Sequence, residues 1–268
     1  MSVQAPDQFI KPSSLLLTVS GVTLQYQTDT DVVQATYRVS FDVFQSDRYV
    51  ILGASGCGKS TLLKALGGYI RPVEGEMRLR QRLISRPGRD RVMVFQEFDQ
   101  LLPWKTVEEN VLFALKKGSA LTRNDAIDRA RKYIDKVGLG KFAGSYPHTL
   151  SGGMKARVAI ARGMAMEPDI LLMDEPFAAL DAFTRQQMQD ELLRLWEDTK
   201  FTVVFVTHSI AEAIKIGSRI LILSPHPGRV RAEFGCCGTD RIIEITDRRL
   251  SETIHTLLFE QPDVTLGV

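Results

Sequence analysis

Two segments near the start of the chain alternate hydrophobic and polar positions. They run from Leu15 to Tyr26 and from Val39 to Phe44, and alternation with a period of two is typical of half-buried β-strands. The polar stretch from Thr28 to Thr36 lies between them and is interpreted as a hairpin loop. The pattern therefore predicts an antiparallel β region at the start of the fold.

Further along, short apolar runs alternate with stretches of helical spacing. The runs predicted as buried strands are Tyr49–Leu52, Val92–Phe95, Ile170–Met173, Thr202–Thr207 and Ile220–Ser224. The stretches predicted as helices are Ser60–Leu66, Ala182–Thr199 and Ile210–Ile216. Strands that alternate with helices are typical of a layered α/β core in which the strands run mostly parallel.

A helical pattern interrupts this alternation and predicts an inserted helical subdomain at about residues 97–165. Thr122 is followed three residues later by Asp125, which resembles a capping box and predicts a helix that ends near Gly138. Ser151 precedes the next helical stretch and has the side chain of a good N-cap residue. The chain is therefore expected to hold a second, all-helical unit within the α/β core.

The composition is that of an ordinary soluble globular protein, with 268 residues, 44% hydrophobic residues and a net charge of +2. This balance lacks the basic excess of a nucleic-acid-binding surface, so no nucleic-acid partner is expected. No apolar run approaches the roughly 18 residues of a membrane-spanning helix, and residues 1–14 lack the pattern of a secretory signal. Cys57, Cys236 and Cys237 show no metal-ligand spacing, and a reducing compartment fits them.

A glycine-rich segment follows the predicted strand Tyr49–Leu52. It matches the phosphate-binding pattern G-x-x-x-x-G-K-[ST] with Gly53, Ala54, Ser55, Gly56, Cys57, Gly58, Lys59 and Ser60. Glycines let backbone N–H groups wrap a phosphate group, and the helix that follows points its positive end at the same anion. In such a loop Lys59 reaches the β- and γ-phosphates and Ser60 can ligate Mg²⁺. A turn that matches by chance is the alternative.

Two acidic residues end the predicted strand Ile170–Met173. Asp174 can hold Mg²⁺ through water, and Glu175 stands where a base can polarise an attacking water. Taken alone, this segment is equally consistent with a core strand followed by an acidic turn. The phosphate-binding pattern upstream favours a nucleotide-hydrolysing site.

The segment Leu150–Met154 (LSGGM) resembles the LSGGQ signature motif of the ABC (ATP-binding cassette) ATPases. By the same resemblance, the family's Q-loop corresponds to Gln96, its D-loop to Asp181 and its H-loop to His208. Its adenine-stacking aromatic residue corresponds to Tyr26. The resemblance covers about residues 15–234. It implies an α/β fold: a P-loop NTPase core with an antiparallel β subdomain and an inserted α-helical signature subdomain.

The same resemblance implies that the chain consists of one domain with an extension at each end. The ABC ATPase domain is expected at residues 15–239, between an N-terminal extension at 1–14 and a C-terminal helical extension at 240–268. In the last part, four apolar residues have the spacing of a packed helix: Leu250, Ile254, Leu257 and Leu258.

The resemblance also implies roles in binding and hydrolysing ATP. The implied nucleotide-binding residues are Tyr26, the loop from Gly53 to Thr61 and, reaching the ATP of a partner chain, Ser151, Gly152, Gly153 and Asp181. The implied Mg²⁺ ligands are Ser60, Gln96 and Asp174. The implied catalytic residues are Glu175 as general base, with His208 and Gln96 near the γ-phosphate.

Three of these residues have plainer interpretations. Gln96 is alternatively an ordinary loop glutamine, Tyr26 a core aromatic at a strand end, and His208 a helix-capping residue. The sequence also departs from the family at Met154, which replaces the usual glutamine, and at Ala156, where glutamine is frequent. Neither departure removes a catalytic group, because the serine and backbone N–H groups of the signature bind the phosphate.

Segments around the motifs resemble the nitrate, sulfonate and taurine importer branch of the family: Phe95–Asn110, Asp174–Asp181 and Ser224–Arg229. That branch implies a homodimer or pseudo-dimer with ATP at its interface, transmembrane permease subunits and, indirectly, an extracytoplasmic solute-binding protein. The subunit is then expected at the cytoplasmic face of the membrane, as a peripheral protein. The apolar stretch from Phe98 to Trp104 is interpreted as a groove for a permease helix, or alternatively as subdomain core.

Three rival functions fit the sequence less well. A soluble ABC ATPase of DNA repair carries a long coiled-coil insertion, and one of translation usually carries two cassettes. A P-loop kinase or GTPase leaves Leu150–Gly153 unexplained. A nucleotide-binding regulator without turnover is disfavoured because Glu175 and His208 are both present.

Overall fold

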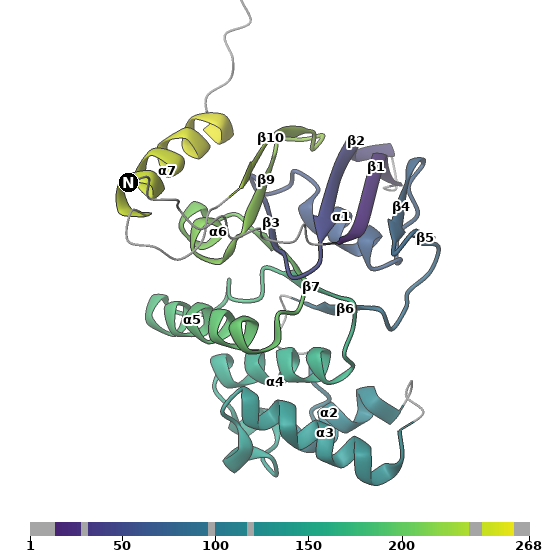
Figure 1. The fold of residues 1–268 in the computed structure, drawn as a ribbon, viewed down its shortest axis with the longest axis vertical. Coiled ribbons are helices and arrows are strands. Elements are labelled where there is room, and N and C mark those ends of the chain that lie inside the picture. The colour runs from purple at the N-terminus through teal and green to yellow at the C-terminus, as the bar shows by residue number, and fades with distance from the viewer. Residues whose placement is uncertain (1–13, 28–31, 96–99, 117–120, 236–242, 260–268) are drawn as a thin grey trace, which may run out of the picture.

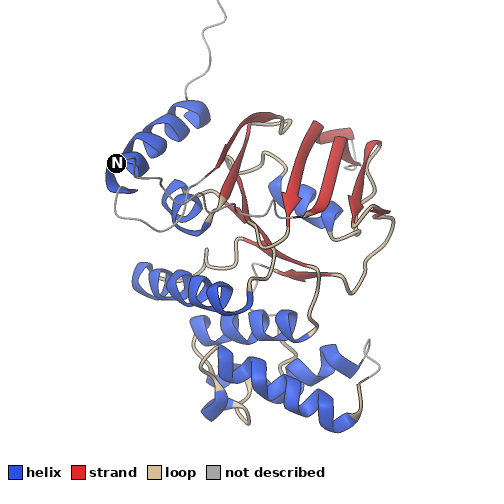
Figure 2. Ribbon diagram, viewed as in Figure 1, coloured by secondary structure: helices blue, strands red, loops and turns tan. Residues whose placement is uncertain are grey.

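The structure is a computed structural model that describes residues 14–27, 32–95, 100–116, 121–235 and 243–259. Two β-sheets and a set of helices build it (Figures 1 and 2). In Figure 1 the six-stranded sheet crosses the middle of the molecule and the four-stranded sheet lies at the upper right. Helices from the middle of the chain form a separate unit at the bottom. The predicted α/β architecture with its two subdomains is therefore confirmed.

The four-stranded sheet is antiparallel and has the order β2-β1-β4-β5. Its strands are β1 (Leu15–Gln27), β2 (Val32–Phe44), β4 (Glu74–Leu79) and β5 (Arg82–Leu83). The predicted strand pair is confirmed, but the predicted loop is wrong over residues 32–36, which belong to β2. Val33 pairs with Tyr26 and Thr36 with Leu24. Pairing with β1 thus outweighs the polar character of this stretch.

The six-stranded sheet has the order β10-β9-β3-β8-β7-β6, and its neighbours pair in parallel except for β10 with β9. Its strands are β3 (Arg48–Leu52), β6 (Arg91–Val94), β7 (Ile170–Asp174), β8 (Val203–Thr207), β9 (Arg219–Leu223) and β10 (Val230–Gly235). The first five confirm the predicted strands. The strand β10 has no counterpart in the prediction.

Both faces of the six-stranded sheet are buried along its central strands β3, β7, β8 and β9. In β3, Tyr49 and Ile51 belong to the core shared with the four-stranded sheet and with α1 (Lys59–Leu66), whereas Val50 and Leu52 belong to the core on the other face. The helix α1 contacts β7 and β8 on one side and β2 on the other. The loop that precedes α1 is therefore held between two packed layers.

Three helices form the inserted subdomain: α2 (Val107–Lys116), α3 (Arg123–Lys136) and α4 (Gly152–Ala165), with two 3₁₀ helices at Gly140–Phe142 and Pro147–Thr149. Both predicted caps are confirmed. The Thr122 hydroxyl accepts the N–H of Asp125, and the Ser151 hydroxyl accepts the N–H of Met154, each at 3.3 Å. Gly138 follows α3 with a φ of +70°, a conformation that ends helices.

The remaining helices are α5 (Ala182–Thr199), α6 (Ile210–Ile216) and α7 (Ile243–Phe259). The helix α6 packs against β3 and β8, and α7 packs against α6 and β9. Ile254 and Leu258 are buried in the same core as Ile216, which confirms the packed helix predicted near the end of the chain. Within the described ranges, no helix combines the length and the apolar character that crossing a membrane requires.

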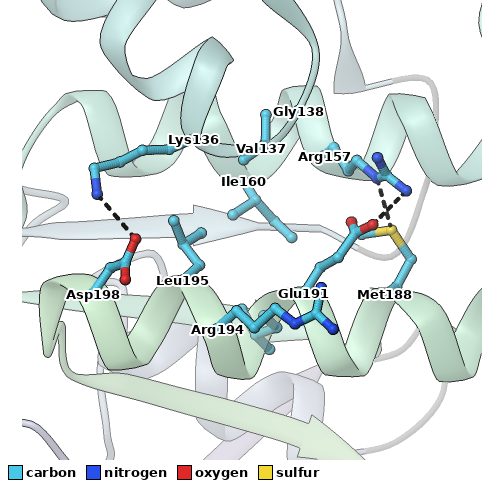
Figure 3. A pocket seen from close by; sticks show the side chains of 11 residues that line it. Lys136, Val137, Gly138, Arg157, Ile160, Met188, Glu191, Arg194, Leu195 and Asp198 are labelled. Carbon is cyan, nitrogen blue, oxygen red and sulfur yellow. Dashed lines mark hydrogen bonds and ion pairs between the residues drawn. The ribbon is translucent and has the colours of Figure 1, made fainter.

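A cavity of about 220 Å³ lies at the joint between the helical subdomain and α5 (Figure 3). Apolar side chains, including Ile160, line part of it. Two ion pairs cross the joint, from Arg157 to Glu191 at 2.7 Å and from Lys136 to Asp198 at 3.6 Å. Burial raises the pKa of Glu191 even though Arg157 lowers it. This joint therefore combines two ion pairs with apolar packing beside an open cavity.

Candidate functional site

The glycine-rich loop, Asp174, Glu175 and His208 meet at the carboxyl ends of three adjacent strands. The strand order places β8 between β3 and β7, and the three run parallel. The glycine-rich loop follows β3, Asp174 ends β7, and His208 follows β8. Because parallel strands end at one edge of a sheet, segments 114 residues apart come into contact there.

The loop between β3 and α1 requires glycine. Gly56 and Gly58 have φ angles of +80° and +95°, which residues with a side chain rarely adopt. A Cβ atom at Gly58 would also lie 2.4 Å from the backbone oxygen of Ala35 in β2. The helix α1 begins directly at Lys59, so the loop lies at a helix N-terminus, where anions are favoured. Cys57 is buried within this loop, and burial raises the pKa of its thiol.

Lys59 is held inside the loop with 4% of its side chain exposed. Its ammonium group donates to the backbone oxygens of Gly53 at 2.8 Å and Ala54 at 2.9 Å. The carboxylate of Glu175 lies 4.0 Å from the same nitrogen. A buried cation needs partners of this kind, and they fix a positive charge beside the backbone N–H groups of the loop.

Ser60 and Asp174 form an oxygen pair beside the loop. The Ser60 hydroxyl, in the first turn of α1, donates to Oδ1 of Asp174 at 2.8 Å. Burial raises the pKa of Asp174, while the hydrogen bond from Ser60 lowers it. Hydroxyl and carboxylate oxygens suit a hard cation such as Mg²⁺. The described residues contain no cluster of three or more His, Cys, Asp or Glu suited to a metal.

Glu175 and His208 face each other across β7 and β8. The distance from His208 Nδ1 to Glu175 Oε2 is 2.9 Å. Glu175 has a φ of +43°, a strained conformation for a residue with a side chain, and its N–H donates to Val206 at 3.1 Å. The interpretation of His208 as a helix cap is wrong, because Ser209 caps α6. The Glu175 carboxylate and the His208 imidazole therefore orient one another, on a Glu175 backbone that is itself strained.

A second cavity of about 220 Å³ opens above the loop. Its lining residues come from the glycine-rich loop, the four-stranded sheet and two further segments: Tyr26, Ala35, Ser55, Gly56, Gly58, Lys59, Ser60, Thr61, Glu175 and His226. Tyr26 is 46% exposed, so the interpretation of this residue as a core aromatic is wrong. His226 is not one of the predicted site residues, although it lies within Ser224–Arg229, a segment that resembles the importer branch.

Several predicted residues do not line this cavity. Gly53, Ala54, Cys57, Asp174 and His208 lie next to residues that do, whereas four others are at two helix starts. Ser151 caps α4, where Gly152 and Gly153 form the first turn, and Asp181 caps α5 by accepting the N–H of Thr184 at 3.0 Å. This hydrogen bond lowers the pKa of Asp181. A Cβ atom at Gly153 would lie 2.9 Å from the Thr184 side chain, so the two helix starts are neighbours. Gln96 lies outside the described residues.

A strand, a glycine-rich loop that ends in Lys59 and Ser60, and a carboxylate pair on a nearby strand define a P-loop nucleotide hydrolase. Comparison with known proteins shows to which family of P-loop nucleotide hydrolases the chain is similar. The family model described as ABC transporter matches residues 36–178. The chain is 49% identical to the taurine import ATP-binding protein of Rhizobium johnstonii, over 87% of this chain and 92% of that protein. It is 41% identical to the aliphatic sulfonates import ATP-binding protein of Bacillus cereus, over 81% and 84%.

Among solved structures, the fold matches a dimeric ATP-binding cassette in a post-hydrolysis state bound to ADP and Pi. The TM-score is 0.70 and the identity 31%, over 84% of this chain and 100% of that chain. The chain belongs to the ABC transporter family. It is an ATP-binding and ATP-hydrolysing subunit that energises import, as the sequence predicts.

Proposed function

We propose that the imported solute is a small anion, with sulfonates such as taurine as first candidates and nitrate as another member of the class. The names of the two curated relatives support sulfonates. The observation that supports the ATPase site is that Lys59, Ser60 and Glu175 line one cavity. Asp174 is hydrogen-bonded to Ser60, and His208 to Glu175. ATP-dependent uptake by the assembled transporter, with labelled taurine competed by alkanesulfonates or nitrate, tests the solute class.

The proposed mechanism assigns one task to each group. Lys59 and the N–H groups of residues 53–61 hold the phosphates of ATP. Glu175 accepts a proton from the attacking water, and His208 orients the Glu175 carboxylate and contacts the γ-phosphate. Gln96 is proposed to complete this set. A positioned base and fixed positive charge both act on the developing transition state.

Mg²⁺ is proposed to bind between Ser60, Asp174 and the nucleotide, with Gln96 as a further ligand. The 2.8 Å contact between the Ser60 and Asp174 oxygens supports this assignment, since both are hard donors beside the phosphate loop. When bound, the ion neutralises charge on the β- and γ-phosphates.

We further propose that ATP is closed between two copies of the chain, or two homologous chains. Ser151, Gly152, Gly153 and Asp181 lie at two neighbouring helix starts outside the cavity of their own chain. A helix N-terminus presents unpaired N–H groups that favour an anion. The start of α4 in one chain would then bind the γ-phosphate held by the other, while Asp181 lies at the dimer contact.

The remaining partners are proposed to be transmembrane permease subunits, with an extracytoplasmic binding protein reached through them. The subunit would then lie peripherally at the cytoplasmic face of the membrane. Trp104 is 70% exposed, whereas Leu101 in the same apolar stretch is 3% exposed. Phe98, at the start of that stretch, lies outside the described residues. The exposed tryptophan is the proposed permease contact, and Leu101 belongs to the core.

Replacing Lys59 by alanine is expected to weaken ATP binding by about tenfold or more, because a hydrogen bond to a charged group is worth roughly 1.5–3 kcal/mol. Calorimetry on the isolated subunit measures this. The matched control is Lys64→Ala, which removes an exposed lysine from the same helix. Equal affinity in Lys59→Ala and wild type would refute the assignment of the phosphate loop.

Replacing Trp104 by alanine is expected to leave the melting temperature and ATP affinity of the isolated subunit unchanged, because the side chain is exposed. Copurification with the permease should weaken by about 2 kcal/mol, or roughly 30-fold, since tryptophan is frequent among interface hot spots. Uptake should fall accordingly. Leu83→Ala, at an exposed position in β5, is the control. A destabilised subunit that still copurifies fully would rule out docking at Trp104.

A further inference from the structure

We infer that His226 is a further nucleotide-contacting residue, placed at the base and ribose end of the ATP cavity. The inference rests on the proposed binding of ATP in this cavity. His226 lines the cavity together with Tyr26 and the phosphate loop. It belongs to none of the motifs that mark nucleotide binding in the sequence, and it comes from the connection between β9 and β10.

The connection that carries His226 is closed by its own hydrogen bonds. The N–H of Ser224 donates to the backbone oxygen of Arg229 at 2.8 Å. The Ser224 hydroxyl accepts the N–H of Arg229 at 3.0 Å and donates to the backbone oxygen of Pro227 at 3.1 Å. These bonds span the loop from end to end, so the backbone of His226 is held in a defined place.

Gly228 fastens this loop to two walls of the cavity. Its N–H donates to the backbone oxygen of Ala35, and its own oxygen accepts the N–H of Tyr37, both at 2.9 Å. A Cβ atom at Gly228 would lie 2.3 Å from the backbone oxygen of Cys57, so no side chain fits between the loop and the phosphate loop. His226, two residues earlier, therefore stands where β2 and the phosphate loop meet.

This position belongs to the base and ribose end. Lys59 and Glu175 mark the phosphate end of the cavity. Tyr26 enters from β1, whose partner strand β2 provides Ala35, the residue bonded to the His226 loop. The loop of His226 belongs to the six-stranded sheet, and its bonds to β2 place it beside the sheet that carries Tyr26. An imidazole can stack on a base and offers a donor and an acceptor to ribose hydroxyls.

The test compares ATP with inorganic tripolyphosphate, which carries the phosphates without base or ribose. His226→Ala should bind ATP at least about fivefold more weakly than wild type, the low end for one stacking contact to a base. Its affinity for tripolyphosphate should stay at the wild-type value. The control is His148→Ala, because His148 stacks on Tyr146 in the helical subdomain. Calorimetry provides the affinities, and thermal unfolding verifies that both variants fold.

Two results would overturn the inference. One is wild-type ATP affinity in a folded His226→Ala variant. The other is an equal loss for ATP and tripolyphosphate, which would place the effect at the phosphates. Failure of the proposed function looks different, because the wild-type protein would then bind neither ligand.

Discussion

Replacing Glu175 by glutamine is expected to lower ATP hydrolysis by about 100-fold or more, since a positioned general base contributes roughly 10²–10⁴-fold. Glutamine keeps the shape of the side chain but cannot accept the proton of the attacking water. ATP binding should survive, because the phosphates are held by the loop and Lys59. Phosphate release measures the rate. The variant should also elute as a dimer with Mg-ATP and as a monomer without it, since the nucleotide is not consumed.

Glu167→Gln is a matched control for this experiment. Glu167 also has a positive φ, +48°, and it pairs with Arg129 at 3.0 Å, remote from the residues that line the nucleotide cavity. Its replacement should leave hydrolysis unchanged. Normal turnover by Glu175→Gln would contradict the role of Glu175 as general base.

Replacing Ser151 by arginine is expected to abolish ATP-dependent dimerisation while each chain still binds ATP. The reason is the position of Ser151 at the start of α4, outside the cavity of its own chain. A bulky cation there would block the approach of this helix start to the γ-phosphate held by the partner. Size-exclusion chromatography of a Ser151→Arg, Glu175→Gln double variant with Mg-ATP measures the dimer, and calorimetry measures binding.

The control for this variant is Thr122→Arg, which removes the N-cap of a different helix in the same subdomain. Loss of a cap costs about 1 kcal/mol of stability, so both variants should show a similar small drop in melting temperature. The Thr122→Arg chain should still dimerise. A Ser151→Arg chain that forms the ATP dimer would refute the interpretation of Leu150–Met154 as a signature motif.

Much of the six-stranded sheet could be predicted, because strands that are buried on both faces appear in sequence as continuous apolar runs. β4 and β5 gave no such signal. In β4, Met77 and Leu79 are buried, but the strand also carries Glu74, Gly75 and Glu76. β5 is two exposed residues long. Both strands exist because a neighbour offers a free edge, and a short local window does not contain that information.

The candidate site also contains residues that the sequence can predict and residues that it cannot. Residues within nucleotide-binding motifs could be named from the sequence, since their spacing itself carries the chemistry. His226 could not, because its place depends on a tertiary contact of Gly228 with Cys57. Leu101 and Trp104 were predicted as parts of one apolar stretch, yet the chain buries the first and exposes the second. Apolar character alone does not reveal the direction of side chains in an irregular segment.

The cavity between the helical subdomain and α5 lies beside two kinds of contact that respond differently to salt. Ile160, Leu192 and Leu195 belong to one buried core, so apolar packing joins the two parts of the molecule. Arg157–Glu191 and Lys136–Asp198 cross the same joint as ion pairs between partly exposed side chains. Salt screens exposed charges and leaves buried apolar contacts in place. We therefore expect added salt to loosen the ion pairs while the apolar contact between the helical subdomain and α5 persists.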